Sequence, residues 1–285
     1  MNAFSNPQQQ LEHLFTTQLV EHDFEQLFLS HVEYFRQYQQ AQFSYRHFSD
    51  ATARCHAPIT SYENLLHYIT LYGYAHFQRF RYLVQHALDH GMQLNQGNVL
   101  RITDYGCGQG IATLACLELL QDKLTDFESV EIVLIEPSEL AASRAKKWLD
   151  AKIKQYTGTQ FKLSVHAHAF DHLKVPKLAM RDGVALHLFS NVLDVYSSKR
   201  FDMQHLVNLT KTSLKHHYFL AISPDYAGSH FGFSEFLRYL KPESILLHQH
   251  GYLPVIEYRI YDRQLQRNSK PIHALVCYQS VEETI

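Results

Sequence analysis

The sequence predicts an α/β protein: a mostly parallel seven-stranded sheet with an antiparallel pair of strands at its carboxyl-terminal end, preceded by a helical lobe. Three observations carry this prediction. Strand-like and helix-like segments alternate between residues 99 and 222, a glycine-rich loop follows the first strand-like segment, and no helix separates the last two strand-like segments. Alternating strands and helices are typical of a parallel sheet, because each parallel connection must cross back over the sheet.

A glycine-rich loop follows the first strand-like segment. That segment ends in Asp104, and glycines then occupy alternate positions at Gly106, Gly108 and Gly110. Glycine reaches backbone conformations that other residues avoid, and it lets a ligand approach bare main chain. The free amides at the start of the next helix-like segment, residues 111–120, favour an anionic group nearby. The loop is therefore the first candidate for a binding site.

The glycine spacing excludes two other phosphate-binding loops. A dinucleotide-binding fingerprint needs G-x-G-x-x-G, and Ile111 stands where its third glycine belongs. A P-loop needs Gly-Lys-Ser or Gly-Lys-Thr to hold a triphosphate and its magnesium ion, and neither follows here. A nicotinamide-dependent oxidoreductase is therefore only the third interpretation of this loop.

Residues 104–110 read Asp-Tyr-Gly-Cys-Gly-Gln-Gly and resemble the D/E-x-G-x-G-x-G signature of class I S-adenosylmethionine (SAM)-dependent methyltransferases, a family with a Rossmann-like fold. The order of motifs is similar to that family from about residue 99 to residue 279. The resemblance implies an enzyme of the EC 2.1.1 type with S-adenosyl-L-methionine as its cofactor. It also implies that the loop holds the methionine part of the cofactor, through Asp104, Gly106, Cys107, Gly108 and Gly110.

A second acid ends the next strand-like segment, residues 130–135. Glu136 lies 26 positions after Gly110, compatible with the spacing of about 20 at which a carboxylate in a doubly wound sheet accepts hydrogen bonds from ribose hydroxyls. The resemblance implies that Glu136 holds the ribose, with Pro137 beside it. The alternative interpretation of Glu136 is a solvated strand end. Ser138 can cap a helix over residues 139–156, because its hydroxyl can satisfy free amides at the helix start.

Further strand-like segments cover residues 161–170, 183–189 and 218–222, with a helix-like segment at 201–213. The resemblance implies that the adenine is held by Phe170 and Asp171, after the third of the chain's strands. A plain helix cap is the alternative interpretation of Asp171. The last two strand-like segments, residues 254–261 and 272–278, are expected to pair antiparallel with each other.

The carboxyl end of the fourth strand is the expected reaction edge, because open α/β sheets bind ligands there. Ser190 and Asn191 are candidates for the cofactor side, and Asn191, Asp194 and Tyr196 are candidates for catalysis. Asp194 is equally compatible with capping the next turn. Amino-methylating DNA enzymes carry an Asn/Asp-Pro-Pro-Tyr-like motif at this place, and the absence of prolines after Asn191 disfavours that subclass.

Residues 1–95 are expected to form the helical lobe and residues 96–285 the SAM-binding domain. Asp23-x-x-Gln26 and Thr60-x-x-Glu63 resemble capping boxes ahead of amphipathic helices. The helix after Thr60 is expected to end by Gly91, with a core stripe of Leu66, Ile69, Phe77, Phe80 and Val84.

Three polar or aromatic residues lie on the face beside that stripe: Tyr72, His76 and Arg79. Helices that precede the first strand in methyltransferases of this plan often roof the cofactor pocket. The resemblance therefore implies that these three residues face the substrate, with His76 a candidate for catalysis. Ordinary helix packing is the alternative. Gly73, inside the helix, indicates the close approach of another element or a ligand, since glycine costs about 1 kcal/mol there relative to alanine.

The composition of the chain limits the classes of partner that we expect. The chain has 285 residues, 46% of them hydrophobic, and a net charge of −2, which does not favour nucleic acid as the main partner. No apolar run reaches the ~20 residues of a membrane span, and the first residues lack the blocks of a signal peptide, so a cytoplasmic protein is expected. The oligomeric state is left open.

Histidine and cysteine do not predict a metal site. Two H-x-H pairs occur among 20 histidines, His166/His168 and His248/His250, and neither has a recognisable third ligand nearby. The four cysteines show no C-x-x-C spacing and are expected to be reduced thiols: Cys55, Cys107, Cys116 and Cys277.

The sequence favours a SAM-dependent methyltransferase that acts on a small molecule or a protein side chain. RNA methylation is the closest alternative. A non-catalytic, methyltransferase-like protein that binds SAM as a scaffold is an alternative of a different class.

Overall fold

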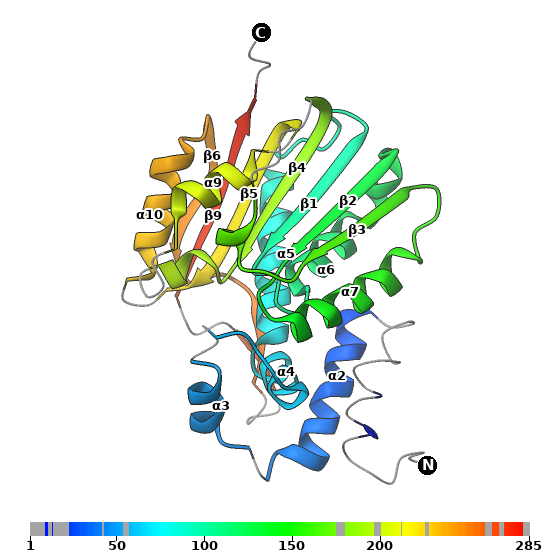
Figure 1. Ribbon diagram of the computed structural model, residues 1–285, viewed down its shortest axis with the longest axis vertical. Helices are drawn as coiled ribbons and strands as arrows, with labels where there is room; N and C mark the ends of the chain where they lie inside the picture. The colour runs from blue at the N-terminus through cyan, green and yellow to red at the C-terminus, as the bar shows by residue number, and fades with distance from the viewer. Residues whose placement is uncertain are drawn as a thin grey trace.

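The computed structural model of the chain describes residues 9–10, 13, 23–41, 43–53, 57–174, 180–196, 201–211, 213–225, 228–259, 264–267 and 271–281. A seven-stranded sheet forms its centre, and a helical lobe lies beyond the carboxyl ends of the parallel strands (Figure 1). The strand expected at residues 254–261 is described only as far as residue 259, because residues 260 and 261 lie outside the described residues.

The strands of the central sheet follow the order β3-β2-β1-β4-β5-β9-β6. Every pairing is parallel except those of β9, which runs antiparallel to both of its neighbours. The bounds are β1 (Val99–Tyr105), β2 (Ser129–Ile135), β3 (Gln160–His166), β4 (Arg181–Ser190), β5 (Leu214–Pro224), β6 (Ser244–Gly251) and β9 (Ile272–Ser280). The mostly parallel seven-stranded sheet with an antiparallel carboxyl-terminal pair is therefore confirmed.

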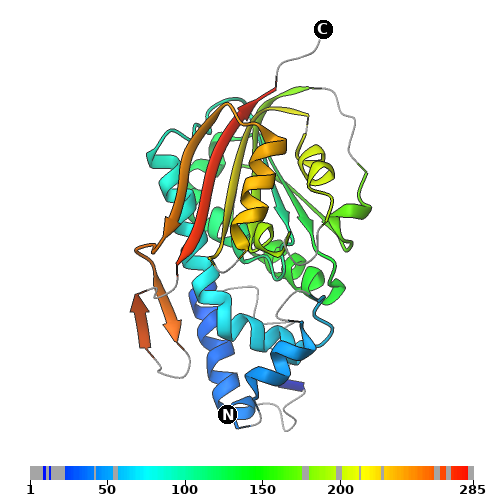
Figure 2. The ribbon, with the colours of Figure 1, turned by 90° about the vertical axis from the view of Figure 1, so that its left-hand side faces the viewer.

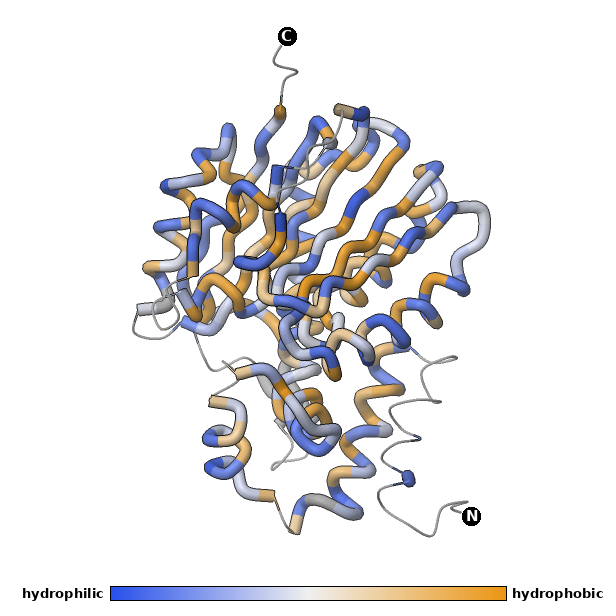
Figure 3. Tube along the Cα trace, viewed as in Figure 1, coloured by the Kyte–Doolittle hydropathy of each residue, from blue (hydrophilic) through white to orange (hydrophobic). Residues whose placement is uncertain are grey.

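Helices cover both faces of the sheet and bury two apolar clusters. The larger cluster lies under α5 (Tyr74–Asp89), α6 (Ile111–Leu120) and α7 (Glu139–Ile153), and α2 (Phe24–Tyr34) of the lobe adds residues to it. The second lies under α9 (Met203–Thr210) and α10 (Ser229–Leu240) on the other face. Successive strand residues alternate between the faces, so Leu186 and Leu188 join the first cluster and Phe189 joins the second. Figure 3 shows apolar residues running along the strands between these layers.

The lobe consists of α2, a π-helical turn η1 (Phe35–Gln39), α3 (Tyr45–Ala51) and α4 (Tyr62–Tyr68). A second π-helical turn, η2 (Ile69–Gly73), joins α4 to α5 without a break. Figure 2 shows the lobe below the sheet, with a two-stranded ribbon of β7 (Ile256–Arg259) and β8 (Gln264–Arg267) on the same side.

The π turn explains the core stripe of this long helix. Ile69 and Phe77 are eight residues apart, which in a regular α-helix of 3.6 residues per turn would separate their directions by about 80°. A π turn absorbs about one extra residue, so the separation falls to about 20°. Both side chains are buried, as are Leu66, Phe80 and Val84, so the stripe is confirmed. At Gly73 a Cβ would lie 2.7 Å from Ile69 Cγ1, one turn back in the same helix, and only in ordinary contact, at 3.6 Å, with Phe24 Cζ of α2.

Two of the three helix caps are confirmed. Asp23 accepts a hydrogen bond from the Gln26 amide at the start of α2, and Ser138 caps α7 through the Ala141 amide. The prediction for Thr60 is wrong by one residue. Ser61 caps α4 instead, because its extended backbone turns the hydroxyl toward the Asn64 amide.

The partner of the last strand is also corrected. β9 pairs with β6, whereas residues 256–259 pair with β8 in the separate ribbon. β6 is an edge strand, and most of its side chains are exposed or half-buried, so its sequence shows little apolar alternation. Two other bounds shift: β3 ends at His166, short of residue 170, and β5 extends from 214 to 224.

Candidate functional site

The candidate site lies where the strand order reverses. β1 connects to β2 on one side, while β4 lies on the other side of β1. At such a switch point the loops after the two strands diverge and leave room for a ligand. Here those loops are the glycine-rich loop after β1 and the segment after β4 that begins at Asn191.

The glycine loop needs its glycines for different reasons. Gly106, Gly108 and Gly110 have φ of +65°, +52° and +78°, a region that residues with a Cβ rarely adopt. A Cβ on Gly106 would lie 2.9 Å from Val192 Cγ2, and one on Gly110 would lie 3.1 Å from Ala145 Cβ. A Cβ on Gly108 would meet no described atom within 4 Å. Gly106 and Gly110 therefore serve close packing, and Gly108 presents bare main chain to open space.

Asp104 is a fully buried carboxyl group at the start of the loop. Its Oδ2 accepts a hydrogen bond of 2.7 Å from Thr113 Oγ1 on α6, and its Oδ1 has no hydrogen-bond partner among the described residues. Burial raises the pKa of Asp104 to about 7, and the nearby Glu136 acts in the same direction. A buried, unpartnered carboxyl oxygen costs free energy unless a donor satisfies it. The atom is thus suited to a cationic or hydrogen-bonding ligand group.

Glu136 lies against the same loop from the end of β2. Its Oε2 accepts from the Gly108 amide at 2.9 Å, and its Oε1 accepts from the Ser138 amide at 2.9 Å. Glu136 is buried, with only 8% of its surface exposed, so the interpretation as a solvated strand end is wrong. Pro137, next to it, is exposed.

His76 and Asn191 meet across the site, although 115 residues separate them. Asn191 Nδ2 lies 2.6 Å from His76 Nε2, and His76 Nδ1 lies 3.3 Å from the Tyr68 hydroxyl. Asn191 has a left-handed backbone with φ of +57°, which asparagine tolerates better than most residues. Burial, and to a lesser degree Arg79, lowers the pKa of His76 to about 3. His76 is therefore a neutral imidazole held between the lobe and β4.

The other two residues on this face of the helix differ in exposure. Tyr72 is half-buried, its ring is nearly parallel to that of His76 with centroids 6.1 Å apart, and its hydroxyl donates to the Tyr45 hydroxyl. Arg79 is buried, with 6% of its surface exposed.

Asp194 and Tyr196 turn toward the second apolar cluster. Asp194 is buried in the short helical turn η5 (Leu193–Val195), and its Oδ1 accepts from the Ser223 hydroxyl at 2.9 Å. The Tyr196 ring packs edge-on against Phe201, with centroids 5.3 Å apart. Phe170 packs against the same Phe201 ring, from the turn η4 (Phe170–His172) after β3.

Asp171, in that turn, is exposed, and Ala169 occupies the cap position before it. Ser190 is the last residue of β4 and half-buried. The expected adenine side and reaction edge therefore lie at the carboxyl ends of β3 and β4.

The lobe is hydrogen-bonded to the loops that follow β1 and β2. Gln109 Nε2, inside the glycine loop, donates to the Leu65 carbonyl at 3.0 Å. Ser138 Oγ donates to the Ile59 carbonyl at 2.5 Å. Both acceptors belong to the segment that leads into α4 or to α4 itself, so the lobe lies directly over the carboxyl ends of β1 and β2.

Sequence reasoning missed three contributors: Tyr68, Gln109 and Thr113. Thr113 lies in the first turn of the helix after the loop, nine residues after Asp104, so its place in the sequence could have indicated the contact. Tyr68 and His76 are eight residues apart, and only the π turn brings them onto one face. No pattern in the sequence marks that turn.

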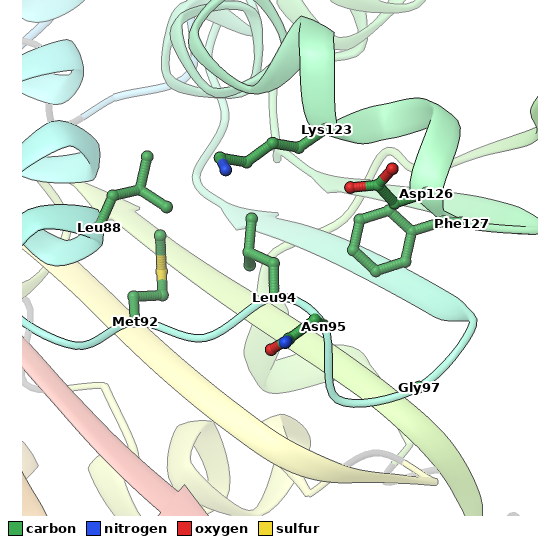
Figure 4. Close-up of a pocket in the computed structure, with 8 residues that line it drawn as sticks. All are labelled: Leu88, Met92, Leu94, Asn95, Gly97, Lys123, Asp126 and Phe127. Atoms are coloured by element: carbon green, nitrogen blue, oxygen red, sulfur yellow. The ribbon is translucent and has the colours of Figure 1, made fainter.

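A surface cavity of about 440 Å³ lies elsewhere, between the end of α5 and the turn after α6 (Figure 4). Its apolar floor, which includes Met92, Leu94 and Phe127, is already buried, and Lys123 and Asp126 at its rim are exposed. It contains none of the residues expected to bind cofactor or substrate.

The described part of the chain holds neither a metal-binding cluster nor a membrane-spanning helix. No three His, Cys, Asp or Glu side chains there are grouped so as to hold a metal ion. Within the same residues, no helix combines the length and apolar character needed to cross a membrane. Cys107, Cys116 and Cys277 are buried free thiols, and Cys55 lies outside the described residues.

Comparisons with known proteins give similarity at the level of fold. No protein-family model and no curated protein sequence matches the chain. A putative class I S-adenosylmethionine-dependent methyltransferase from Listeria monocytogenes is 14% identical, with 96% of this chain and 80% of that chain covered and a TM-score of 0.45. Magnesium protoporphyrin IX methyltransferase from Synechocystis PCC 6803, solved with bound SAM, is 14% identical, with 89% of this chain and 97% of that chain covered and a TM-score of 0.42.

Such distant similarity assigns no activity to this chain. The sheet itself, with six parallel strands and one antiparallel strand, a glycine loop after β1 and an acid after β2, is the mostly parallel, Rossmann-like α/β fold that the sequence predicts.

Proposed function

We propose that the chain is a SAM-dependent methyltransferase that acts on a small-molecule or protein acceptor. The observation that carries the proposal is the arrangement around Gly108: bare main chain facing open space, with the carboxyl groups of Asp104 and Glu136 beside it. The helical lobe, residues 1–95, would cover the site, and residues 96–285 would form the cofactor-binding domain.

The charge of the site favours this cofactor over a dinucleotide. SAM carries a sulfonium and an ammonium group, and both are stabilised near carboxylates. A nicotinamide dinucleotide would instead bring a pyrophosphate to the loop, where the Asp104 carboxylate would repel it. Asp104 Oδ1 is suited to the methionine ammonium group, and Glu136 to the ribose hydroxyls. Phe170 and Asp171 stand on the adenine side, at the end of β3.

The acceptor side would be formed by Asn191 and His76. Because the pKa of His76 is about 3, its ring is neutral, and the Asn191 amide donates to Nε2. The ring proton therefore stays on Nδ1 and donates to the Tyr68 hydroxyl. When bound, SAM supplies an activated methyl group that a nucleophile removes by in-line displacement. His76 then holds the Asn191 side chain in place, and Asn191 orients the acceptor, which is the main requirement of such a step.

A pair of alanine variants tests the cofactor site. Gly108→Ala and Gly158→Ala both place a Cβ on a left-handed backbone, with φ of +52° and +88°, and neither Cβ meets a described atom within 4 Å. Gly158 lies just before β3, at the amino-terminal ends of the parallel strands, whereas the glycine loop lies at their carboxyl ends. Titration calorimetry with S-adenosylhomocysteine should show binding to the wild type and to Gly158→Ala. Binding to Gly108→Ala should be about tenfold weaker or worse, and Gly108→Trp should abolish it.

Equal affinity of the two alanine variants would contradict the assignment of the loop. Tight binding of NAD, with no binding of S-adenosylhomocysteine, would favour the oxidoreductase alternative.

The acceptor class requires a separate experiment. The protein is incubated with methyl-labelled SAM and fractionated lysate, before and after treatment with nuclease or protease. Label that resists nuclease supports the proposed acceptors, and label that nuclease removes supports RNA methylation. SAM binding without transfer to any fraction supports the non-catalytic scaffold.

A further inference from the structure

A chain of buried polar side chains crosses three strands on the α9/α10 face of the sheet. The Tyr105 hydroxyl of β1 lies 3.2 Å from Nδ1 of His187 on β4. His187 Nε2 lies 3.0 Å from Nδ1 of His217 on β5, and His217 Nε2 lies 2.7 Å from the Leu214 carbonyl. All three side chains are almost fully buried. The polar chain uses His187, which the proposed reaction leaves without a role.

The direction of every hydrogen bond follows from the Leu214 end. A carbonyl oxygen only accepts, so His217 carries its proton on Nε2. Both histidines are neutral, because burial lowers their pKa values, to about 4 for His217. His217 Nδ1 therefore accepts from His187 Nε2, and His187 Nδ1 accepts from the Tyr105 hydroxyl. Each ring nitrogen of the two histidines therefore has one hydrogen-bond partner of the matching kind. The Tyr105 hydroxyl is the donor at the β1 end of this chain of hydrogen bonds.

Tyr105 connects this polar chain to both sides of the candidate site. It directly precedes Gly106, the first glycine of the loop. Its ring stacks on Phe189 of β4, with centroids 4.7 Å apart and planes 8° apart. Phe189 stands two residues before Asn191, the residue proposed for the acceptor side. A displacement of the Tyr105 ring would therefore move the glycine loop relative to the segment after β4.

We infer that Tyr105, held by His187 and His217, is a positioning residue that fixes the glycine loop in the geometry required for cofactor binding. This inference rests on the proposed function, because it assumes that the loop binds SAM. Tyr105 acts through the backbone of Gly106 and not through contact with the ligand.

Two tyrosine variants, each of which loses one buried hydroxyl group, test the inference. Tyr105→Phe keeps the ring and leaves His187 Nδ1 without its donor. Tyr218→Phe also removes one buried hydroxyl of the sheet, which accepts from the Gln93 amide at 2.9 Å on the opposite face, away from the loop. Both variants should unfold at a somewhat lower temperature than the wild type. Only Tyr105→Phe should weaken S-adenosylhomocysteine binding, by about fivefold, well below its unfolding temperature.

The tautomers provide a test that needs no variant. Long-range ¹H–¹⁵N spectra of the labelled wild-type protein should show His187 and His217 as neutral rings protonated at Nε2. Protonation of His187 at Nδ1, or equal binding by the two tyrosine variants, would overturn the inference. If the wild type itself binds no S-adenosylhomocysteine, the proposed function fails first, and the tautomers still decide whether the hydrogen-bond chain exists.

Discussion

Asp104 is a buried carboxyl group whose protonation the cofactor should control. Burial raises its pKa to about 7 without ligand, so the carboxyl group keeps its proton far above the pH at which an ordinary aspartate loses it. A cationic ligand beside Oδ1 favours the charged form and lowers this pKa. Binding should therefore release a proton, and affinity for S-adenosylhomocysteine should rise as the pH increases from about 6 to 8. Calorimetry in two buffers with different ionisation enthalpies measures the released proton.

Thr113 offers the matched control for Asp104. Thr113→Val keeps the side-chain shape and removes the hydrogen bond that lowers the pKa of Asp104. The pH dependence of binding should therefore shift to higher pH in this variant, whereas Asp104→Asn should bind weakly with no such dependence. An affinity of the wild type that stays flat across this pH range would contradict a protonated Asp104.

At the scale of elements, α10 packs unusually closely on η5, the turn that follows Asn191. A Cβ on Gly232 would lie 1.7 Å from the Leu193 carbonyl oxygen and 2.7 Å from its carbon. Helix propensity alone favours alanine over glycine by about 1 kcal/mol. The clash with backbone should reverse that sign, so Gly232→Ala should lower the free energy of unfolding by about 2 kcal/mol or more. Denaturant titration measures this.

Ser234, in the same helix, is exposed and provides the comparison. Ser234→Ala should be neutral or slightly stabilising, because it improves helix propensity without touching η5. A stable Gly232→Ala variant would mean that α10 can move away from η5 at little cost.

The elements that the sequence predicted best are those with strong local signals. The bounds of α6, residues 111–120, were correct at both ends, since Gly110 precedes the helix and an apolar run fills it. α10 was not predicted, although Phe233, Phe236 and Leu240 have helical spacing. β6 was missed because an edge strand buries little of either face.

The candidate site was predictable to a different extent on its two sides. Asp104, Gly108 and Glu136 stand at spacings that local patterns in the sequence reveal; in the structure Glu136 accepts from the Gly108 amide and lies near enough to Asp104 to raise its pKa. The contact between His76 and Asn191 depends on the π turn and on how the lobe lies over the sheet, which no local pattern encodes. Asp194 has the residue type of a base, but its bond to Ser223 depends on the register of β5.

At the scale of the whole molecule, buried neutral histidines should make stability depend on pH. Burial is the largest cause of the lowered pKa at six of them: His31, His67, His76, His187, His217 and His273. A histidine in the unfolded chain has a pKa near 6.5 and takes up a proton more readily. The stabilisation is therefore present above pH 6.5 and is lost as the pH falls toward the folded values, about 4 for His67, His217 and His273.

Asp104 acts with the opposite sign, because its raised pKa means that the folded state holds the extra proton between about pH 4 and 7. The effect of this one carboxyl group on stability offsets that of about one histidine, so the remaining histidines determine how stability changes with pH. Each contributes at most about 1.4 kcal/mol per pH unit. The unfolding temperature should therefore fall steeply between about pH 6.5 and 4.5, as thermal melts across this range can measure.

A substitution at His67 tests the contribution of one buried histidine separately from the others. Its ring is buried among Phe35, Phe43 and Phe48, and neither ring nitrogen has a hydrogen-bond partner within the described residues. His67→Leu should raise stability by about 1 kcal/mol at pH 7.5, because it removes two unsatisfied polar atoms from an apolar site. The gain should be larger at pH 5, where the unfolded wild-type chain is stabilised by protonation. A gain that does not change with pH would show that His67 is not held neutral by burial.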